Sequence, residues 1–509
     1  MIDPKSRRQF LKTAAAGGVA WTAADWAFLG TLPRVSAADV VAVSDRVQFT
    51  PEIEPLVRLI EDTPREQVLE RLASVIRKGT PYRDVLAALQ LTGIRNVQPR
   101  PVGFKFHSVL VVNSCHLASA AGPEDERWLP IFWAVDYVKS TQAEERQKTG
   151  WNMKPVDEAK VPKGPDAAKL FAEAMDQWDV DKADYATAGI VRSLKKEEVF
   201  ELFARYAARD FRDIGHKAIF LANAWRTLEV IGWQHAEPIL RSLAYAMMYY
   251  GNESNPATSD LAADRPWKQN AELLARQPVP SGKSRSDAGA TNELIAGIRI
   301  GTAQDTAKNA AEILSAGVSP ISVWDGVFVS AGELLMRQPG IVSLHGLTTS
   351  NAVHYIAGQV KDETLRQRLL LQCCSFNAMF RDAAKGRGQL SSLAVADVAP
   401  LGGVSGGPFT VDEIFADVAT DKLRASRKLH SYLNAGGDPK AVLDAARRLI
   451  FQKGSNAHDY KFSSAVLEDF ANVSPAFRNQ FLALSVFNLK GTTDKDSGLI
   501  GRTRAALQA

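Results

Sequence analysis

Histidine is the residue whose placement in this 509-residue chain points most directly to chemistry. Imidazole binds zinc, copper, iron and nickel, and it also acts as a general base near neutral pH. Six of the eight histidines lie in pairs within three apolar stretches, where a polar side chain needs a partner. The sequence therefore predicts that several histidines meet at one site. The three pairs are His107 and His116, His216 and His235, and His345 and His354.

The stretch from Phe211 to Tyr250 contains the second pair and predicts two helices joined at Gly232. Apolar residues recur along its first half at the spacing of a buried helix face. His216 and Asn223 fall on one row beside that face. Two interpretations stay open: the row lines a ligand or metal pocket, or it belongs to a hydrogen-bonded polar network in the core.

The first and third pairs share one spacing, in which five residues separate a histidine from an asparagine and two more precede the next histidine. The asparagine and the second histidine lie on one helical face. The first histidine reaches that side only from a loop before the helix, so we expect Thr348 or Thr349 to be the N-cap in the later copy. The spacing is compatible with an internal repeat and with coincidence. The copies are His107, Asn113 and His116, and His345, Asn351 and His354.

These residues receive candidate roles. His216 and His345 are predicted to act as a base or as metal ligands. Asn223 and Asn351 are predicted to orient them or to hold a substrate oxygen. The cofactor we expect is a histidine-bound transition metal or a non-covalently held haem, since no CxxCH motif for attached haem occurs. The candidate metal ligands are His107, His116, His235 and His354, and the tryptophans predicted to line an apolar substrate pocket are Trp225, Trp233 and Trp324.

The N-terminus carries the most specific motif of the chain. Residues Ser6–Lys12 read SRRQFLK, and they are followed by a small-residue, mildly apolar run and then by Val35-Ser36-Ala37. This segment resembles a twin-arginine (Tat) export signal at every position of its pattern. The resemblance implies a signal peptide over residues 1–37, the Tat translocase as a partner during export, and a periplasmic or secreted protein. Proteins on this route often carry a cofactor that is inserted before export.

Composition excludes several classes of function. Residues 1–37 hold five basic and two acidic residues, so without them the formal net charge falls from +4 to about +1. That balance predicts no nucleic-acid partner. No later stretch has the apolar length of a membrane-spanning helix, so we expect no stable membrane anchor. Three cysteines do not make a disulfide framework, and we expect them to be buried free thiols.

The remaining pattern predicts an all-α fold. Helical hairpins are expected to pack as a bundle or repeat-like array, because no segment shows convincing strand alternation. The polar stretches 141–196 and 251–290 are predicted to be surface loops, and a late helix is predicted over Ser463–Phe470. The domain division we expect is a signal over 1–37, an N-terminal helical segment over 38–100, a histidine-containing core over 101–400 and a C-terminal helical segment over 401–509.

Three short segments resemble the questin oxidase-like family of helical oxygenases, which act on aromatic polyketides. They are the helix with His107 and His116, the sequence GHKAIF at Gly215–Phe220, and the sequence LHGLTT at Leu344–Thr349. The resemblance implies oxidation of an aromatic or polycyclic substrate with molecular oxygen, with His216 and His345 facing that substrate. The chain departs from the family pattern at Phe220, where a second histidine is expected.

These observations together favour an exported oxidoreductase with a histidine-lined helical pocket and a small-molecule substrate. Two other readings remain: a non-catalytic periplasmic helical binding or scaffold protein, and a histidine-ligated metal or haem protein.

Overall fold

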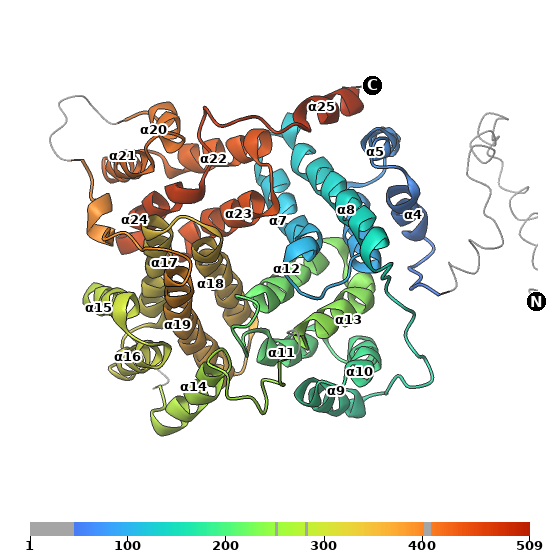
Figure 1. Cartoon of the computed structure of the whole chain (residues 1–509), viewed down its shortest axis with the longest axis horizontal. Coiled ribbons are helices and arrows are strands. Elements are labelled where there is room, and N and C mark those ends of the chain that lie inside the picture. Colours follow the sequence, from blue (N-terminus) through green and yellow to red (C-terminus); the bar gives the residue numbers. More distant parts are fainter. Residues whose placement is uncertain (1–44, 250–252, 280–283, 402–408, 509) are drawn as a thin grey trace, which may run out of the picture. The chain divides into compact units, whose positions relative to one another are not determined.

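The computed structural model describes residues 45–249, 253–279, 284–401 and 409–508. The chain divides into two units, residues 1–46 and 47–509, and only Asp45 and Arg46 of the first unit are described. The predicted Tat signal therefore lies outside the described residues. All helices discussed below belong to the second unit (Figure 1).

The described residues form α-helices and short 3-10 turns, and the one β feature among them is an isolated bridge between Arg285 and Val318. The predicted all-α class is confirmed. The helices of the first half are α4 (Glu54–Asp62), α5 (Val68–Arg77), α6 (Tyr82–Asn96), α7 (His107–Ala121), α8 (Leu129–Lys148), α9 (Pro165–Gln177), α10 (Val180–Ser193), α11 (Lys196–Ala207), α12 (His216–Ile231) and α13 (Ala236–Met247).

The second half continues in the same style, with short connections between most helices. Its helices are α14 (Arg265–Arg276), α15 (Ala288–Ile300), α16 (Ala303–Ser315), α17 (Pro320–Arg337), α18 (Ile341–Gln359), α19 (Glu363–Lys385), α20 (Val411–Val418), α21 (Lys422–Asn434), α22 (Pro439–Lys453), α23 (Ala457–Asn472), α24 (Pro475–Ser485) and α25 (Ile500–Gln508).

Four helices form a ring at the centre of the fold. α7 packs against α12, α12 against α18, α18 against α23, and α23 against α7 (Figure 1). Most residues of α7, α12 and α18 are buried, including most of their polar side chains. Such helices bury their whole circumference only when neighbours cover every face. Here α8 covers α7, α13 covers α12, and α17 and α19 cover α18.

The four ring helices run in the same direction. Each begins close to a histidine, and these histidines meet at one end of the ring, as described below. Two turns further along, side chains of all four helices meet again around one small cavity. Residues of the four helices meet at two levels, first at the histidines and again two turns later. This happens only if the helices run in the same direction, because each helix rises by about 1.5 Å per residue.

Three expectations about local structure were wrong. The stretch predicted as a loop over 141–196 contains α9 and α10, and the one over 251–290 contains α14. α9 and α14 each have a proline in the first turn and bury one mostly apolar face. The loop prediction was wrong because it gave weight to the prolines and to the polar outer faces of these helices. The expected N-cap at Thr348 or Thr349 was also wrong, since α18 already begins after Gly340.

Other expectations hold. The hairpin joined at Gly232 is confirmed as α12 and α13, with Gly232 at a φ of 107° that favours glycine. Cys115, Cys373 and Cys374 are buried and unpaired. Among the described residues, no helix has the length and apolar character needed to cross a membrane.

Candidate metal centre

Four histidines lie at the starts of the four ring helices. His107 is the first residue of α7, His216 is the first residue of α12, and His458 is the second residue of α23. His345 lies just beyond the first turn of α18. Because the four helices are parallel and adjacent, their starts converge, and the imidazole rings come together from segments that are far apart in the sequence.

The ring nitrogens of three of these histidines face one another. The Nε2 atom of His216 lies 3.0 Å from Nε2 of His107 and 3.1 Å from Nε2 of His345. All three residues are buried, with exposed fractions of 1–6%. His216 therefore stands between the other two, with its Nε2 lone pair directed at theirs.

The opposite nitrogen of each ring fixes the tautomer. Nδ1 of His107 lies 2.6 Å from the carbonyl oxygen of Phe104, and Nδ1 of His216 lies 2.7 Å from that of Asp213. His345 Nδ1 lies 2.6 Å from the carbonyl oxygen of Ile341. A carbonyl oxygen only accepts hydrogen bonds, so each Nδ1 carries the proton and donates it. In a neutral ring Nε2 is then a bare lone pair.

The three rings are neutral at neutral pH. Burial is the main cause that holds the pKa of His107, His216 and His345 well below the usual range, and the charge of Lys461 lowers each pKa further. No proton is then available to bridge two Nε2 atoms, and three lone pairs meet at hydrogen-bond distance. Donor atoms around a tetrahedral metal with bonds of about 2.0–2.1 Å lie roughly 3.3 Å apart. The cluster has the spacing of a metal ligand set.

His458 completes the group on its fourth side. Its ring centre lies 4.6 Å from that of His107 and 5.2 Å from that of His345. One donor atom from each of these three residues lies within 4.8 Å of the others. Nε2 of His458 is buried without a hydrogen-bond partner among the described residues, and burial lowers the pKa of His458 to about 4. We assign the candidate centre to His107, His216, His345 and His458, and call it the histidine cluster.

The backbone is strained where it delivers two of these histidines. Three non-glycine residues of the described chain have a positive φ, and two of them, Phe104 at 52° and Ile214 at 44°, lie just before His107 and His216. Such conformations cost free energy and concentrate at functional sites. Phe104 also provides the carbonyl that orients His107. Strained backbone conformations therefore occur immediately before both His107 and His216.

Gly215 sets the position of His216 at the start of α12. Its φ of 81° lies in the left-handed region, and a Cβ atom there would overlap the side chain of Thr349 on α18. The hydroxyl of Thr349 donates to the carbonyl of Ile214 at 3.3 Å. Glycine is therefore required for both conformation and close packing.

A polar layer lies two turns below the histidine cluster. Nδ2 of Asn223 donates to the carbonyl of Leu110 at 2.9 Å, and Nδ2 of Asn113 lies 3.4 Å from the Oδ1 atom of Asn223. On the other side, Nδ2 of Asn351 donates to Oε2 of Glu468 at 2.8 Å. The asparagines hydrogen-bond to neighbouring ring helices and not to the histidines, so they connect the ring helices to one another.

Asp469 is the most perturbed acid of this layer. Burial raises its pKa to about 8, and its Oδ1 atom accepts from Asn351 at 2.9 Å and from Asn472 at 3.1 Å. The carboxyl group is therefore largely protonated at neutral pH. It contributes no negative charge that would balance a cation in the cluster above.

Lys461 lies between the polar layer and the histidine cluster. It is 3% exposed, its Nζ atom has no hydrogen-bond partner among the described residues, and its charge lowers the pKa of all four histidines. Burial lowers the pKa of Lys461 itself to about 7. It lines a cavity of about 20 Å³ together with Asn113, Asn223, Asn351 and Glu468. That volume is enough for one water-sized group.

An open hollow of about 420 Å³ adjoins this cavity and is walled by α7, α22 and α23. Leu117, Ser464 and Glu468 line both spaces. Most of the remaining wall consists of alanine, leucine and isoleucine side chains, with Arg447 among them. The hollow leads from the surface toward Lys461 and has the size of a small-molecule site.

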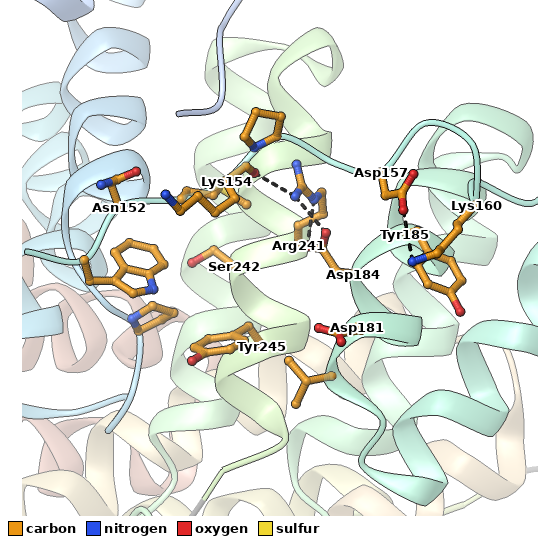
Figure 2. A pocket seen from close by; sticks show the side chains of 15 residues that line it. Asn152, Lys154, Asp157, Lys160, Asp181, Asp184, Tyr185, Arg241, Ser242 and Tyr245 are labelled. Atoms are coloured by element: carbon orange, nitrogen blue, oxygen red, sulfur yellow. Dashed lines mark hydrogen bonds and ion pairs between the residues drawn. The ribbon is translucent and has the colours of Figure 1, made fainter. Parts of the chain in front are cut away.

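A second hollow of about 360 Å³ lies elsewhere, between α10, α13 and the segment after α8 (Figure 2). Figure 2 shows Ser242 and Tyr245 on one side and Asp181 and Asp184 on the other, with Arg241 bonded to Asp184. None of the histidines lines it. It is therefore separate from the histidine cluster, although it is well formed.

The structure brings only some of the sequence candidates together. His107, His216 and His345 join the cluster. His116 instead lies 3.0 Å from the hydroxyl of Tyr82, His235 lies 3.4 Å from the side chain of Gln234, and His354 packs against Trp324 and Phe328. Trp225 and Trp233 pack against each other with ring centres 5.2 Å apart, and none of the three candidate tryptophans lines the cavity or the adjoining hollow.

His458 and Lys461 were missed by the sequence reading. A signal was present, because Asn456 is a good N-cap and His458, Lys461, Ala465 and Glu468 recur at helical spacing after it. The row runs parallel to the row of His216 and Asn223. This row was not predicted to be a buried helix face because most of its residues are polar.

A transition-metal ion fits the histidine cluster, and a haem does not. The Nε2 atoms of His107 and His345 lie 3.0 and 3.1 Å from Nε2 of His216, and no histidine of the cluster lines any of the hollows described above. A porphyrin needs far more room than these contacts leave between the rings. Of the two cofactors expected from the sequence, the structure has a place for the metal.

Comparisons with known proteins assign no relative to this chain. No protein-family model matches it, and searches of curated proteins and of solved structures found no match. The histidine cluster and its surroundings are therefore the basis of the function proposed below.

Proposed function

We propose that this protein is an exported metal-dependent oxidoreductase in which His107, His216, His345 and His458 hold one transition-metal ion. The observation that carries the proposal is the meeting of three unprotonated Nε2 atoms at 3.0 and 3.1 Å while each Nδ1 donates to a carbonyl. Metal-binding histidines characteristically donate their second ring N–H in this way, which fixes ring orientation. A Lewis acid removes the repulsion between the lone pairs.

The donor set favours a first-row transition metal. Four imidazoles without thiolate or carboxylate suit iron, copper, nickel or zinc. A bound metal of this kind would supply Lewis acidity and, for iron or copper, one-electron redox chemistry. The chain's own residues hold the ligands neutral, exclude bulk water by burial and leave one small space beside Lys461. That space holds one water-sized group and is too small for an organic substrate.

The adjoining hollow is the place we propose for the organic substrate. Its volume of about 420 Å³ and its mostly aliphatic wall suit an apolar small molecule. An aromatic or polycyclic substrate oxidised by molecular oxygen, as the resemblance to the questin oxidase-like family implies, is compatible with this division into an outer substrate space and an inner ligand space. Export through the Tat route, with metal inserted into folded protein, completes the proposal.

A structural metal site is the second candidate. Four protein ligands are typical of structural zinc, whereas catalytic zinc keeps a position open for water or substrate. One experiment separates the two. The protein would be produced with its own signal and purified without chelator, and its metal, absorption spectrum and electron paramagnetic resonance would be recorded before and after reduction by ascorbate and reoxidation by air.

We expect iron or copper and a reversible one-electron change that is lost in a His216→Gln variant. His116→Gln is the matched control, because His116 is a half-buried histidine of the ring that lies outside the cluster. Full occupancy by zinc, with no spectral change on reduction, would contradict the oxidoreductase and support the structural site.

A further inference from the structure

We propose that the hollow between α10, α13 and the segment after α8 binds a small organic amine, whose protonated amino group donates to acceptors in the wall and whose apolar body lies against aromatic side chains (Figure 2). The volume of about 360 Å³ suits a small molecule. No cluster histidine lines this hollow, so the inference goes beyond the proposed metal chemistry and does not depend on it.

The walls of the hollow are held in place by two arginines. Arg241 on α13 is 3% exposed, and its Nε and Nη2 atoms each donate to the carboxylate of Asp184 on α10 at 2.8 Å. Nη2 also donates to the carbonyl oxygen of Lys154, in the segment after α8, at 2.9 Å. Arg100 lies 3.5 Å from the ring centre of Tyr245, and its Nε atom donates to the carbonyl of that residue at 2.7 Å. A site that is formed before the ligand arrives binds it at a lower entropic cost.

The charged side chains of the wall favour a cationic ligand. The pair formed by Arg241 is described above, and Lys160 forms an ion pair with Asp157 at 3.0 Å. Lys154 is not free either. Among the described residues, Asp181 is the one charged side chain lining this hollow that has no ion pair. A ligand with a positive charge therefore complements the wall.

Two polar atoms of the wall lack a partner and can accept a hydrogen bond. Oγ of Ser242, a residue that is 2% exposed, and Oδ1 of Asn152 are buried and have no partner among the described residues. In Figure 2 the hydroxyl of Ser242 points away from α13, toward the side of the hollow on which Asn152 lies. Buried polar atoms normally have a partner, and an amide oxygen only accepts. An ammonium group carries three donors and can satisfy both atoms.

Aromatic rings form much of the apolar wall. Trp151, Tyr185 and Tyr245 line the hollow together with Met153 and Val180. The face of an aromatic ring attracts cations as well as apolar groups. An amine with an aromatic or aliphatic body therefore matches the wall, whereas a carboxylate would face Asp181 and find each lysine and arginine of the wall already engaged.

The test uses full-length protein and calorimetric titration with three probes that share an indole ring. Tryptamine carries an ammonium group, tryptophol carries a hydroxyl, and indole-3-propionate carries a carboxylate. The variants are Asp181→Asn and Ser242→Ala. Asp166→Asn is the matched control, because Asp166 is the exposed second residue of α9 just as Asp181 is the exposed second residue of α10. Urea unfolding of each protein confirms that it is folded.

We expect wild-type protein to bind tryptamine at least tenfold more tightly than tryptophol or indole-3-propionate. Asp181→Asn and Ser242→Ala should each weaken tryptamine binding at least fivefold, and Asp166→Asn should bind it like wild type. Ser242→Ala should keep the unfolding midpoint of wild type, since the hydroxyl that it removes makes no hydrogen bond within the described chain.

Two results would overturn the proposal. Wild-type protein that does not bind tryptamine, or that binds the three probes equally, would contradict the amine. Unchanged tryptamine affinity in the Asp181 and Ser242 variants would place the amine elsewhere. His216→Gln should bind tryptamine like wild type, and loss of binding in that variant would assign the amine to the histidine cluster and not to this hollow.

Discussion

The Nε2 atoms of His107 and His216 lie 3.0 Å apart, although Nδ1 of each ring donates to a backbone carbonyl. Two neutral imidazoles in this tautomer have no proton to share, so their approach is repulsive unless a cation lies between them. The same relationship joins His216 to His345 at 3.1 Å. This pairing of fixed tautomers with converging lone pairs is the physical basis of the metal proposal, and the predictions below follow from it.

Acid should displace the metal only at unusually low pH. A histidine binds metal through its unprotonated nitrogen, so protons compete with metal below the histidine pKa. Burial and Lys461 hold these pKa values below the usual range, with that of His458 at about 4. We expect full occupancy at pH 5.5 or so, well below the ordinary histidine pKa of about 6.5, and release near pH 4. Dialysis at stepped pH followed by metal analysis measures this.

Lys461→Met is the informative variant for that titration. Removing the positive charge raises the histidine pKa values, so protons compete more strongly and release should move to higher pH. Unchanged release in the variant would contradict the role given to Lys461, and release from wild type at pH 6.5 would contradict the lowered pKa values.

The metal-free protein should lose stability in acid. The folded pKa of each cluster histidine is lower than its unfolded pKa, so the unfolded chain binds more protons as pH falls below about 6.5. Stability from these residues is complete above that pH and declines below it. We expect the midpoint of urea unfolding of metal-free protein to fall between pH 7 and pH 5, and a His345→Gln variant to show a smaller fall. An identical fall in both proteins would refute the prediction.

Gly215→Ala should destabilise the protein and displace His216. A left-handed φ costs a non-glycine residue about 1–2 kcal/mol, and overlap with Thr349 adds to this. We expect a loss of about 2–4 kcal/mol in unfolding free energy together with reduced metal occupancy. Gly79→Ala is the matched control, because Gly79 has a φ of 98° with open space around it. The Gly79→Ala variant should lose only the unfolding free energy that the left-handed φ costs, and it should keep its metal. Equal losses of unfolding free energy in both variants would show that the contact with Thr349 is unimportant.

Asp469→Asn should make the protein more stable at alkaline pH. The folded pKa of Asp469, about 8, exceeds its unfolded value, so the unfolded chain releases a proton between about pH 4 and pH 8 that the folded chain retains. Wild-type stability therefore falls as pH rises through this window, by up to about 1.4 kcal/mol per pH unit. Asparagine removes the titration and keeps an acceptor for Asn351.

Urea unfolding at pH 4.5, 6 and 8 measures this effect. The advantage of the Asp469→Asn variant over wild type should grow with pH and vanish near pH 4. Asp382→Asn, at an exposed position of α19, is the control and should follow wild type. An advantage independent of pH would mean that the carboxyl group does not titrate as described.

Much of the fold could be predicted because local pattern and burial agree. The apolar spacing of α12 and α13 and the glycine between them specify a hairpin before any tertiary contact is known. Three cluster histidines were predicted for the same reason, because a polar side chain in an apolar helix needs a hydrogen-bond partner or a metal. Part of the spacing shared by the segments at His107 and His345 corresponds to proximity in the fold. His107 and His345 both contact His216, and Asn113 and Asn351 line the same cavity, whereas the second histidine of each segment lies elsewhere.

The failures have a common physical cause. Helix α23 was expected to begin at Ser463, because the residues before it are polar, but it begins at Ala457 and turns those polar residues inward. His458 and Lys461 were lost with that first turn. In α18 the hydroxyls of Thr348 and Thr349 suggested a helix cap, whereas Thr349 is buried and donates to Ile214 on a neighbouring segment. In a buried polar site, polar residues occupy the buried face of a helix, where apolar residues are normally expected. Such a face is recognised from tertiary contacts and not from the spacing of apolar residues.

The metal content of the purified protein and its histidine variants tests the central claim most directly. Wild-type protein, exported through its own signal and purified without chelator, should contain one transition-metal ion per chain. Substitution of His107, His216 or His345 by glutamine should remove it, His458→Gln should at least weaken it, and His116→Gln and His354→Gln should leave it unchanged. Wild-type protein without metal, or loss that does not distinguish the cluster from the two control histidines, would contradict the account.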